Sequence, residues 1–295
     1  MGYLALLAAI SCNAVKGYCG KKQSTYLNGA HDALVVNFLR MLFCAAVGIG
    51  ILLVREGFVL PAFNSVAFPI LILAGAANAA QVVFWMLSVQ RNAVTLTDVF
   101  ATLGLILPTV ACSILFQEKV RLIQWAGYLL LCAAAVVMCS YNISLKNKKM
   151  SVVDFAYLVG FGLSIGAADL TQKLFINCCS EYSTNVYNFY TFLFAALTAV
   201  LLLPLFRKKP EAPPCPVKKV WIYIVLMATS LFFVVWGKAA AAAVLPAVQV
   251  YPLYQGGVLI TMALIAAVFF GEKITRRCVI GMSMAFAAML MMNVL

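Results

Sequence analysis

Acidic, basic and amide side chains interrupt the long apolar runs of this chain at helical spacing. Asp169, Gln172 and Lys173 stand at positions i, i+3 and i+4 of one such run, and Asn13 and Lys16 stand one turn apart in another. Each group therefore shares one face of a helix. A charged side chain in an apolar helix is costly at membrane depth and marks a candidate functional site. Together these groups offer charge and hydrogen bonds to a ligand.

The chemistry that these side chains predict is binding rather than catalysis. The chain has one histidine, His31, and no His-x-x-x-Asp or repeated acidic motif of the kind that a membrane-embedded transferase requires. Its ten cysteines are scattered through apolar stretches, without the clustered spacing of a disulfide framework or a zinc site. We therefore expect no enzyme, no metal and no cofactor, and a membrane-embedded transferase is the least favoured alternative.

The composition predicts a protein that crosses a membrane many times. Of its 295 residues, 65% are hydrophobic and 10% are charged, and the mean hydropathy is +1.01. Most apolar stretches reach the ~20 residues that a helix needs to cross the hydrocarbon core. The first stretch lacks the basic leader of a signal peptide, so we interpret it as a retained helix. The ten stretches lie at about 3–19, 33–54, 66–88, 94–116, 122–141, 152–174, 186–206, 220–241, 247–270 and 274–294.

The formal net charge of +12 is better explained by membrane lipids than by a nucleic acid partner. Most basic residues fall in short loops beside the apolar stretches, where they contact lipid headgroups and determine topology. With ten spans, the more basic loops lie on the side opposite the termini. The positive-inside rule then places both termini outside the cytoplasm. We expect a multi-pass protein of the cell membrane, specifically a bacterial inner membrane.

The second half of the chain repeats the first. Phe116–Lys119 returns 154 residues later as Phe270–Lys273, with a glutamate followed by a lysine in both copies, and Gly127 returns as Gly281. Each motif stands between two apolar stretches of similar length. An internal repeat of this size indicates two related structural units.

A second match extends the repeat toward the start of each half. Residues 37–43 resemble residues 188–194, at an offset of 151. Each half contains five predicted helices, and an odd number makes the two halves cross the membrane in opposite directions. The predicted fold is therefore an all-α membrane protein with ten transmembrane helices as two inverted five-helix repeats, residues 1–145 and 146–295.

Paired five-helix halves, each with a Phe-x-Glu-Lys motif before its last helix, resemble the EamA-like branch of the drug/metabolite transporter superfamily. The resemblance covers nearly the whole chain. It implies a ten-helix carrier that moves small metabolites, amino acids, nucleotide-linked sugars or amphiphilic drugs by alternating access. Members of this family usually hold both termini in the cytoplasm, whereas the charge distribution here predicts the reverse, which leaves the direction of transport open.

The substrate site of such a carrier lies near the membrane midplane between the two halves. Among the charges embedded in the predicted helices, Lys16, Arg40 and Lys238 outnumber Asp98 and Asp169. We therefore predict a small polar or zwitterionic substrate. The main alternative is a proton-coupled exporter of amphiphilic cationic drugs, with Asp169 as the coupling carboxylate. The candidate substrate-binding residues are Asn13, Lys16, Arg40, Gln81, Trp85, Asp169, Gln172, Tyr251, Tyr254 and Gln255.

Some charged residues have a second interpretation. Asp169 would instead form an ion pair with a basic residue of another helix or with Lys173. One register of the repeat makes Lys16 the counterpart of Asp169. Asp98 ends the segment Thr95–Asp98, which is typical of a helix N-terminal cap. Lys238 either lines the binding site or extends toward the headgroups.

Two helices are expected to be irregular. Pro108 removes one backbone hydrogen bond and kinks the fourth stretch. Pro252, followed by the pair Gly256 and Gly257, makes the ninth stretch the best candidate for an irregular helix that lines a cavity.

Overall fold

The computed structural model describes residues 2–62, 65–117, 121–146, 150–206, 215–245, 247–272 and 274–292. These segments form helices and contain no strand, because a backbone in lipid must satisfy its hydrogen bonds internally. Three residues of the repeated motif, Glu118, Lys119 and Lys273, lie outside the described residues. The helices are α1 (Gly2–Ser24), α2 (Ala30–Arg55), α3 (Ala67–Arg91), α4 (Val94–Leu103), α5 (Ile106–Leu115), α6 (Leu122–Lys146), α7 (Val152–Cys178), α8 (Thr184–Leu202), α9 (Val217–Ala242), α10 (Ala247–Phe270) and α11 (Arg276–Met292), with a 3-10 helix η1 at Leu203–Phe206.

Eight helices in the described part of the chain are long and apolar enough to cross a membrane, counting α4 and α5 as one. The protein is therefore a multi-pass membrane protein. The remaining two predicted spans also form helices, α1 and α11. Asn13 and Lys16 make α1 less apolar than the others, and α11 has 17 residues, slightly fewer than a span needs.

The fourth stretch is interrupted, as the proline within it predicts. α4 ends at Leu103 and α5 begins at Ile106. A proline ring clashes with the carbonyl four residues earlier, and for Pro108 that carbonyl belongs to Gly104. The Gly104 oxygen instead accepts a hydrogen bond from the Leu107 nitrogen at 3.1 Å. The helix therefore breaks one turn before the proline.

Glycines at this break bring α4 and α7 into direct backbone contact. A Cβ atom on Gly104 would lie 2.2 Å from the carbonyl oxygen of Gly162, and one on Gly166 would lie 2.3 Å from the carbonyl oxygen of Gly104. No side chain fits at these positions without moving a backbone. Small residues permit this close approach of helices in membranes.

The prediction of an irregular ninth stretch is wrong. α10 is a continuous helix from Ala247 to Phe270, through Pro252 and the glycine pair. Pro252 is the sixth residue of α10 and therefore lies close to the start of the helix. The interruption is therefore confined to the first half of the chain.

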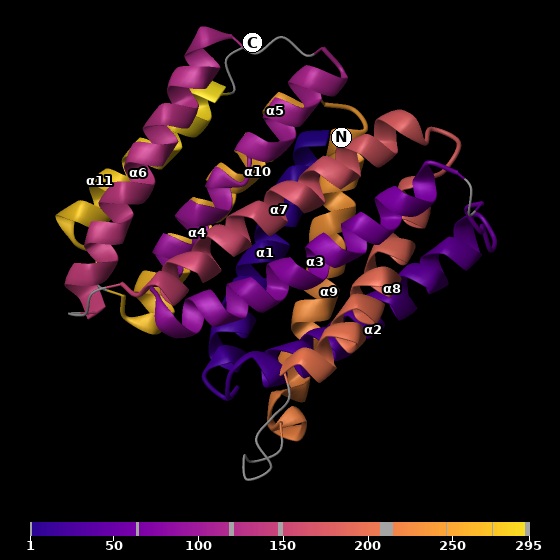
Figure 1. Cartoon of the computed structure of the whole chain (residues 1–295), viewed down its shortest axis with the longest axis horizontal. Helices are drawn as coiled ribbons and strands as arrows, with labels where there is room; N and C mark the ends of the chain where they lie inside the picture. Colours follow the sequence, from indigo (N-terminus) through magenta and orange to yellow (C-terminus); the bar gives the residue numbers. More distant parts are fainter. Residues whose placement is uncertain are drawn as a thin grey trace.

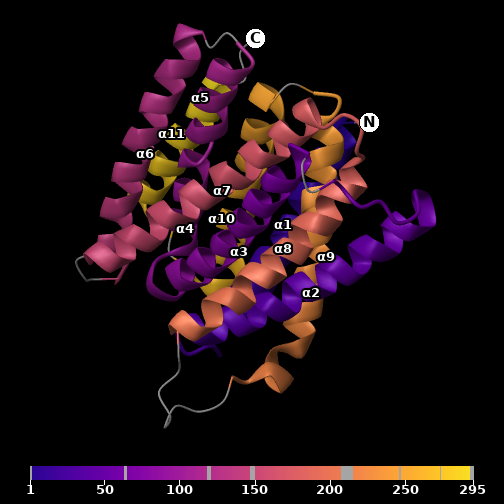
Figure 2. The same cartoon turned by 45° about the vertical axis from the view of Figure 1, so that its right-hand side comes forward.

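The helices pack as one bundle (Figure 1). α6 and α11 lie side by side at one edge, and α2 and α8 lie side by side at the opposite edge. Between these edges, α1 contacts α9 and α10, and α7 contacts α3 and α4. The N- and C-terminal ends lie at the same end of the bundle in both views (Figure 2). The middle of the bundle thus contains α1, α3, α4, α7, α9 and α10.

The contacts between α6 and α11 are reciprocal. A Cβ atom on Gly127 of α6 would lie 3.1 Å from the Cγ atom of Met292, and one on Gly281 of α11 would lie 2.7 Å from the Cγ atom of Met138. The early part of each helix therefore contacts the late part of the other, so the two helices are antiparallel. Adding 154 to Gly127 gives Gly281, and adding 154 to Met138 gives Met292, so the two contacts join equivalent positions of the repeat.

Candidate functional site

A cavity lies in the middle of the bundle, between helices of both halves of the chain. It contains about 860 Å³ of space between atoms, its opening included. Apolar residues of α9 and aromatic rings form part of its wall. Its polar and charged lining consists of Asn13, Lys16, Arg40, Asn78, Gln81, Asp98, Asp169, Gln172, Tyr187, Lys238, Tyr254 and Gln255.

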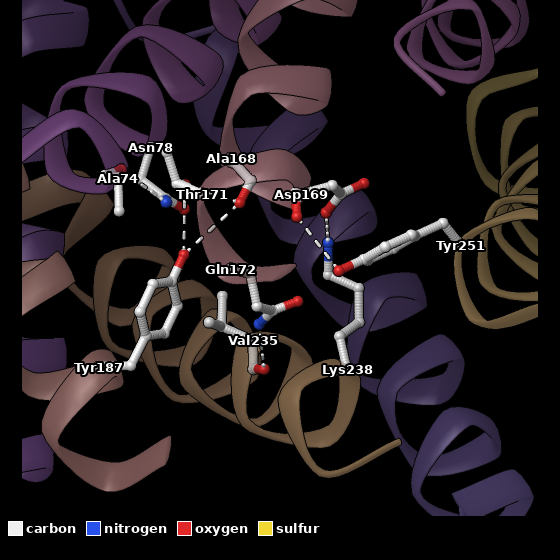
Figure 3. Close-up of polar contacts among 10 residues, drawn as sticks. All are labelled: Ala74, Asn78, Ala168, Asp169, Thr171, Gln172, Tyr187, Val235, Lys238 and Tyr251. Carbon is white, nitrogen blue, oxygen red and sulfur yellow. Dashed lines mark hydrogen bonds and ion pairs between the residues drawn. The ribbon is translucent and has the colours of Figure 1, made fainter. Parts of the chain in front are cut away.

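The structure brings nine of the ten candidate residues together around this cavity. Tyr251 is the exception, because it lies one layer behind the wall, where its hydroxyl donates to the backbone oxygen of Asp169 at 3.1 Å (Figure 3). The nine residues that line the cavity are Asn13, Lys16, Arg40, Gln81, Trp85, Asp169, Gln172, Tyr254 and Gln255.

Asp169 of α7 forms an ion pair with Lys238 of α9 across the cavity wall (Figure 3). The Lys238 ammonium also lies 5.1 Å from the ring centroid of Tyr254 and 5.9 Å from that of Tyr251, within cation–π range. The interpretation of Asp169 as a partner of a basic residue on another helix is therefore confirmed. Lys238 lines the cavity rather than extending to the headgroups, and Lys173 does not line it.

Arg40 of α2 is buried without an acidic partner among the described residues. Its NH2 group donates to the Asn37 side-chain oxygen at 2.9 Å, and its NH1 group lies 3.7 Å from the Met227 sulfur. Its Nε atom has no partner within the described structure. Asn37 is itself held by a hydrogen bond from its amide nitrogen to the Ala79 oxygen at 3.1 Å. The guanidinium is thus fixed in place, and its charge is not neutralised.

Lys16 and Asp98 are also without direct partners in the part of the chain that is described. Lys16 makes no ion pair or hydrogen bond there, although its charge is repelled by Arg40 and Lys238 and attracted by Asp98. Asp98 is buried, and its Oδ2 atom has no hydrogen-bond partner. Both charged groups therefore remain available to a ligand in the cavity.

The capping interpretation of Asp98 is wrong. α4 begins after Ala93 and has no side-chain cap from its own segment. The Val94 nitrogen donates instead to Glu272 Oε1 at 3.0 Å, and the Thr95 hydroxyl lies 3.5 Å from Glu272 Oε2. A carboxylate at the start of a helix is favourable because the helix dipole is positive there. Glu272 supplies that carboxylate. Asp98 lies one turn further along α4, where it lines the cavity.

Amide side chains complete the polar lining. Asn13, Gln81 and Gln255 make no side-chain hydrogen bonds within the described residues. Gln172 donates from Nε2 to the Val235 oxygen at 3.4 Å, and its Oε1 atom has no partner there (Figure 3). A buried amide without a partner costs free energy, so these groups are suited to bind a polar ligand or water.

Four polar lining residues were absent from the predicted set: Asn78, Asp98, Tyr187 and Lys238. Asn78 stands one turn from Gln81 and so shares its helical stripe, which is a signal in the sequence. The Tyr187 hydroxyl contacts the Thr171 hydroxyl at 3.4 Å and the Ala168 oxygen at 3.5 Å (Figure 3). Nothing in the local sequence of Tyr187 distinguishes a cavity residue from an interfacial tyrosine.

Comparison with known proteins identifies the fold. No protein-family model matches the sequence. No curated protein matches it either. A solved structure described as "Crystal structure of protein" is similar to this chain, with a TM-score of 0.68 over 98% of this chain and 95% of that chain, at 14% sequence identity. The fold is therefore shared with a protein of known structure, and at this identity the similarity concerns the fold alone.

Proposed function

We propose that the protein is a secondary transporter that moves a small polar or zwitterionic metabolite across the cell membrane by alternating access. The observation that carries the proposal is the central cavity, where charged and amide side chains from both halves of the chain meet inside an apolar bundle. Such groups are expensive in the interior of a membrane protein and are characteristic of substrate pathways. A ligand site at the interface of two halves is also the arrangement found in alternating-access carriers.

We include in this proposal ten membrane spans, arranged as two inverted five-helix repeats over residues 1–145 and 146–295. α1 has 23 residues and is about 34 Å long at the usual rise per residue, enough to cross the hydrocarbon core. The reciprocal contacts of Gly127 and Gly281 support the inverted relation. Two antiparallel helices that make equivalent contacts with each other are related by a two-fold axis perpendicular to the helix axes.

The packing of the other helices supports the same symmetry. If α1 corresponds to α7 and α3 to α9, the contact of α1 with α9 corresponds to the contact of α7 with α3. Likewise the contact of α2 with α9 corresponds to that of α8 with α3. This pairing, with the repeated Phe-x-Glu-Lys motif, supports assignment to the EamA-like branch of the drug/metabolite transporters.

The charges of the cavity argue against the export of amphiphilic cations. Lys16, Arg40 and Lys238 oppose two carboxylates, and one of these, Asp169, is already paired with Lys238. A site for a lipophilic cation would carry the opposite balance. Export of cations nevertheless has a distinct experimental outcome, described next.

Ligand stabilisation followed by exchange tests the proposal. The purified protein is heated with each member of a library of polar metabolites and lipophilic cations, since a ligand that binds the folded state raises its stability by mass action. A stabilising metabolite is then sealed inside proteoliposomes, and uptake of its labelled form is measured. We expect saturable uptake that depends on the internal metabolite. Lys16→Gln should weaken it, and Lys22→Gln, an exposed lysine at the end of the same helix, is the matched control.

Two outcomes would contradict the proposal. Binding without any exchange would indicate a receptor or an enzyme instead of a carrier. Stabilisation by lipophilic cations alone, lost in Asp169→Asn, would indicate the cation exporter.

A further inference from the structure

We infer that the transported molecule must carry an anionic group, a carboxylate or a phosphate, which binds between Arg40 and Lys16. This inference rests on the proposed transport function and specifies its substrate class. Three observations carry it: the charges that remain unpaired in the cavity, the free donors of Arg40, and the poor match of the cavity to neutral or cationic ligands.

The first observation concerns the charges. Five charged side chains line the cavity, and the ion pair of Asp169 with Lys238 neutralises two of them. The remainder are two cations, Lys16 and Arg40, and one carboxylate, Asp98. The cations repel each other, and in a poorly polarisable interior this repulsion is much stronger than in water. An anionic group near both would remove the repulsion and satisfy both charges.

The second observation concerns the donors of Arg40. A guanidinium carries five N–H donors in a planar fork, and it binds carboxylate or phosphate through two parallel hydrogen bonds. Here the acceptors are one amide oxygen, from Asn37, and one sulfur, from Met227, which is a weak acceptor. The Nε donor has no partner among the described residues, although the side chain is 99% buried. Buried charge without such compensation is costly, so a ligand anion is the missing partner.

The third observation concerns how neutral and cationic ligands would match the cavity. A neutral polar ligand would leave both cations uncompensated, and a cationic ligand would add a third positive charge. Trp85 and Tyr254 provide aromatic surface for the rest of the molecule, and Asp98 provides an acceptor for an ammonium or hydroxyl group. Zwitterions and anions are therefore both accepted, because they share the anionic group.

Matched ligand sets test the requirement on the unmodified protein. Each set contains an acid, its amide and its alcohol: leucine, leucinamide and leucinol; glutamine, glutamine amide and glutaminol; lactate, lactamide and propane-1,2-diol. A fourth set pairs glucose 6-phosphate and gluconate with glucose. Thermal stabilisation and exchange in proteoliposomes are measured for all members. In at least one set we expect the anionic member to bind roughly tenfold or more tightly than its uncharged or cationic relatives, as loss of a charged hydrogen bond implies.

The outcomes separate this inference from the proposed function. If an amide or an alcohol binds and exchanges as well as its acid, transport stands and the anion requirement is overturned. If no member of any set or of the wider library binds, the proposed function fails, and the inference fails with it.

Variants assign the anionic group to Arg40 and Lys16. With the tightest anion from the sets, Lys16→Gln should weaken binding of the acid roughly tenfold while leaving its amide unchanged or improved, because a neutral ligand gains nothing from the charge. Arg40→Lys should retain part of the preference, since charge remains without the planar fork. A structural role alone would reduce acid and amide equally. If the Arg40 variants do not fold, Lys16→Gln against Lys22→Gln decides the question, and equal behaviour of these two variants would overturn the assignment.

Discussion

Lys238 contacts the Asp169 carboxylate and two aromatic rings at once. The two members of this ion pair therefore depend unequally on each other. Asp169 is 1% exposed, Lys238 pairs with its Oδ1 atom, and its Oδ2 atom has no hydrogen-bond partner among the described residues. Lys238 would keep its contacts with Tyr251 and Tyr254 if Asp169 were lost. The aspartate is therefore the more vulnerable member of the pair.

A double-mutant cycle on this pair checks that asymmetry. Lys238→Met strands a buried carboxylate and should cost about 3–5 kcal/mol of stability, the range for a broken buried ion pair. Asp169→Asn should cost less, because cation–π contacts remain for the ammonium. The double variant should be more stable than Lys238→Met alone. Thermal unfolding of the purified variants measures the order, and a double variant as unstable as the sum of the singles would show that the two residues are independent.

Sequence spacing identified most of the polar lining of the cavity but not its charge pairing. Asp169 and Gln172 are recognisable because polar residues in an apolar helix must face protein or water. The partner of Asp169 could not be predicted, since Lys238 lies on a helix whose rotation and height depend on packing. Asp98 was misassigned because Thr-x-Thr-Asp suits a helix cap as well as a cavity. The carboxylate at the start of α4 comes instead from Glu272, which lies 178 residues after Val94 in the sequence, so the local segment does not reveal it.

The contact between α4 and α7 depends on backbone atoms that no side chain separates. A Cβ atom on Gly166 would lie 2.3 Å from the Gly104 oxygen, whereas one on Gly50 of α2 would meet nothing within 4 Å. Both glycines are helical, so alanine improves the intrinsic helix propensity of each equally.

The same substitution should therefore have opposite effects at the two positions. Gly166→Ala should destabilise the protein by about 1–3 kcal/mol, the usual cost of overpacking. Gly50→Ala should leave stability unchanged or raise it by up to about 1 kcal/mol. Thermal unfolding under identical conditions compares them. Equal shifts for the two variants would show that α4 and α7 are not in close backbone contact.

At this scale the sequence predicted the positions of the helices better than their regularity. Helix positions follow from long apolar runs, which need no tertiary information. Pro108 interrupts its helix because it lies far from the helix start, whereas Pro252 lies close to one. The same residue type thus breaks one helix and is accommodated near the start of another, and its distance from the helix start distinguishes the two.

The whole molecule has a basic end and an end at which both termini lie. Lys21 and Lys22 end α1 and Arg91 ends α3, at the end of the bundle away from the termini. The positive-inside rule assigns that end to the cytoplasm. Cys178, at the last residue of α7, is exposed at the terminal end, and Asn28 is exposed at the basic end.

Labelling with a membrane-impermeant maleimide checks this orientation. In intact cells we expect Cys178 to be labelled and the Cys178→Ser variant to lose that signal. Asn28→Cys, made in the Cys178→Ser background, should react only after the cells are permeabilised. The reverse pattern would place the termini in the cytoplasm, as is usual for the family that the sequence resembles.

If the protein is the transporter proposed above, the interruption of α4 and α5 also bears on the kinetics of transport. Adding 154 to Gly104 and Pro108 gives Val258 and Met262, where α10 is unbroken and neither residue is a proline. Two equivalent halves would give inward- and outward-facing states of equal free energy by exchanging their shapes. These halves cannot exchange shapes, so the empty carrier should strongly favour one orientation, and its return should limit net flux. Substrate on the far side should then accelerate uptake. This trans-stimulation would follow from the asymmetry that Pro108 introduces between the two halves.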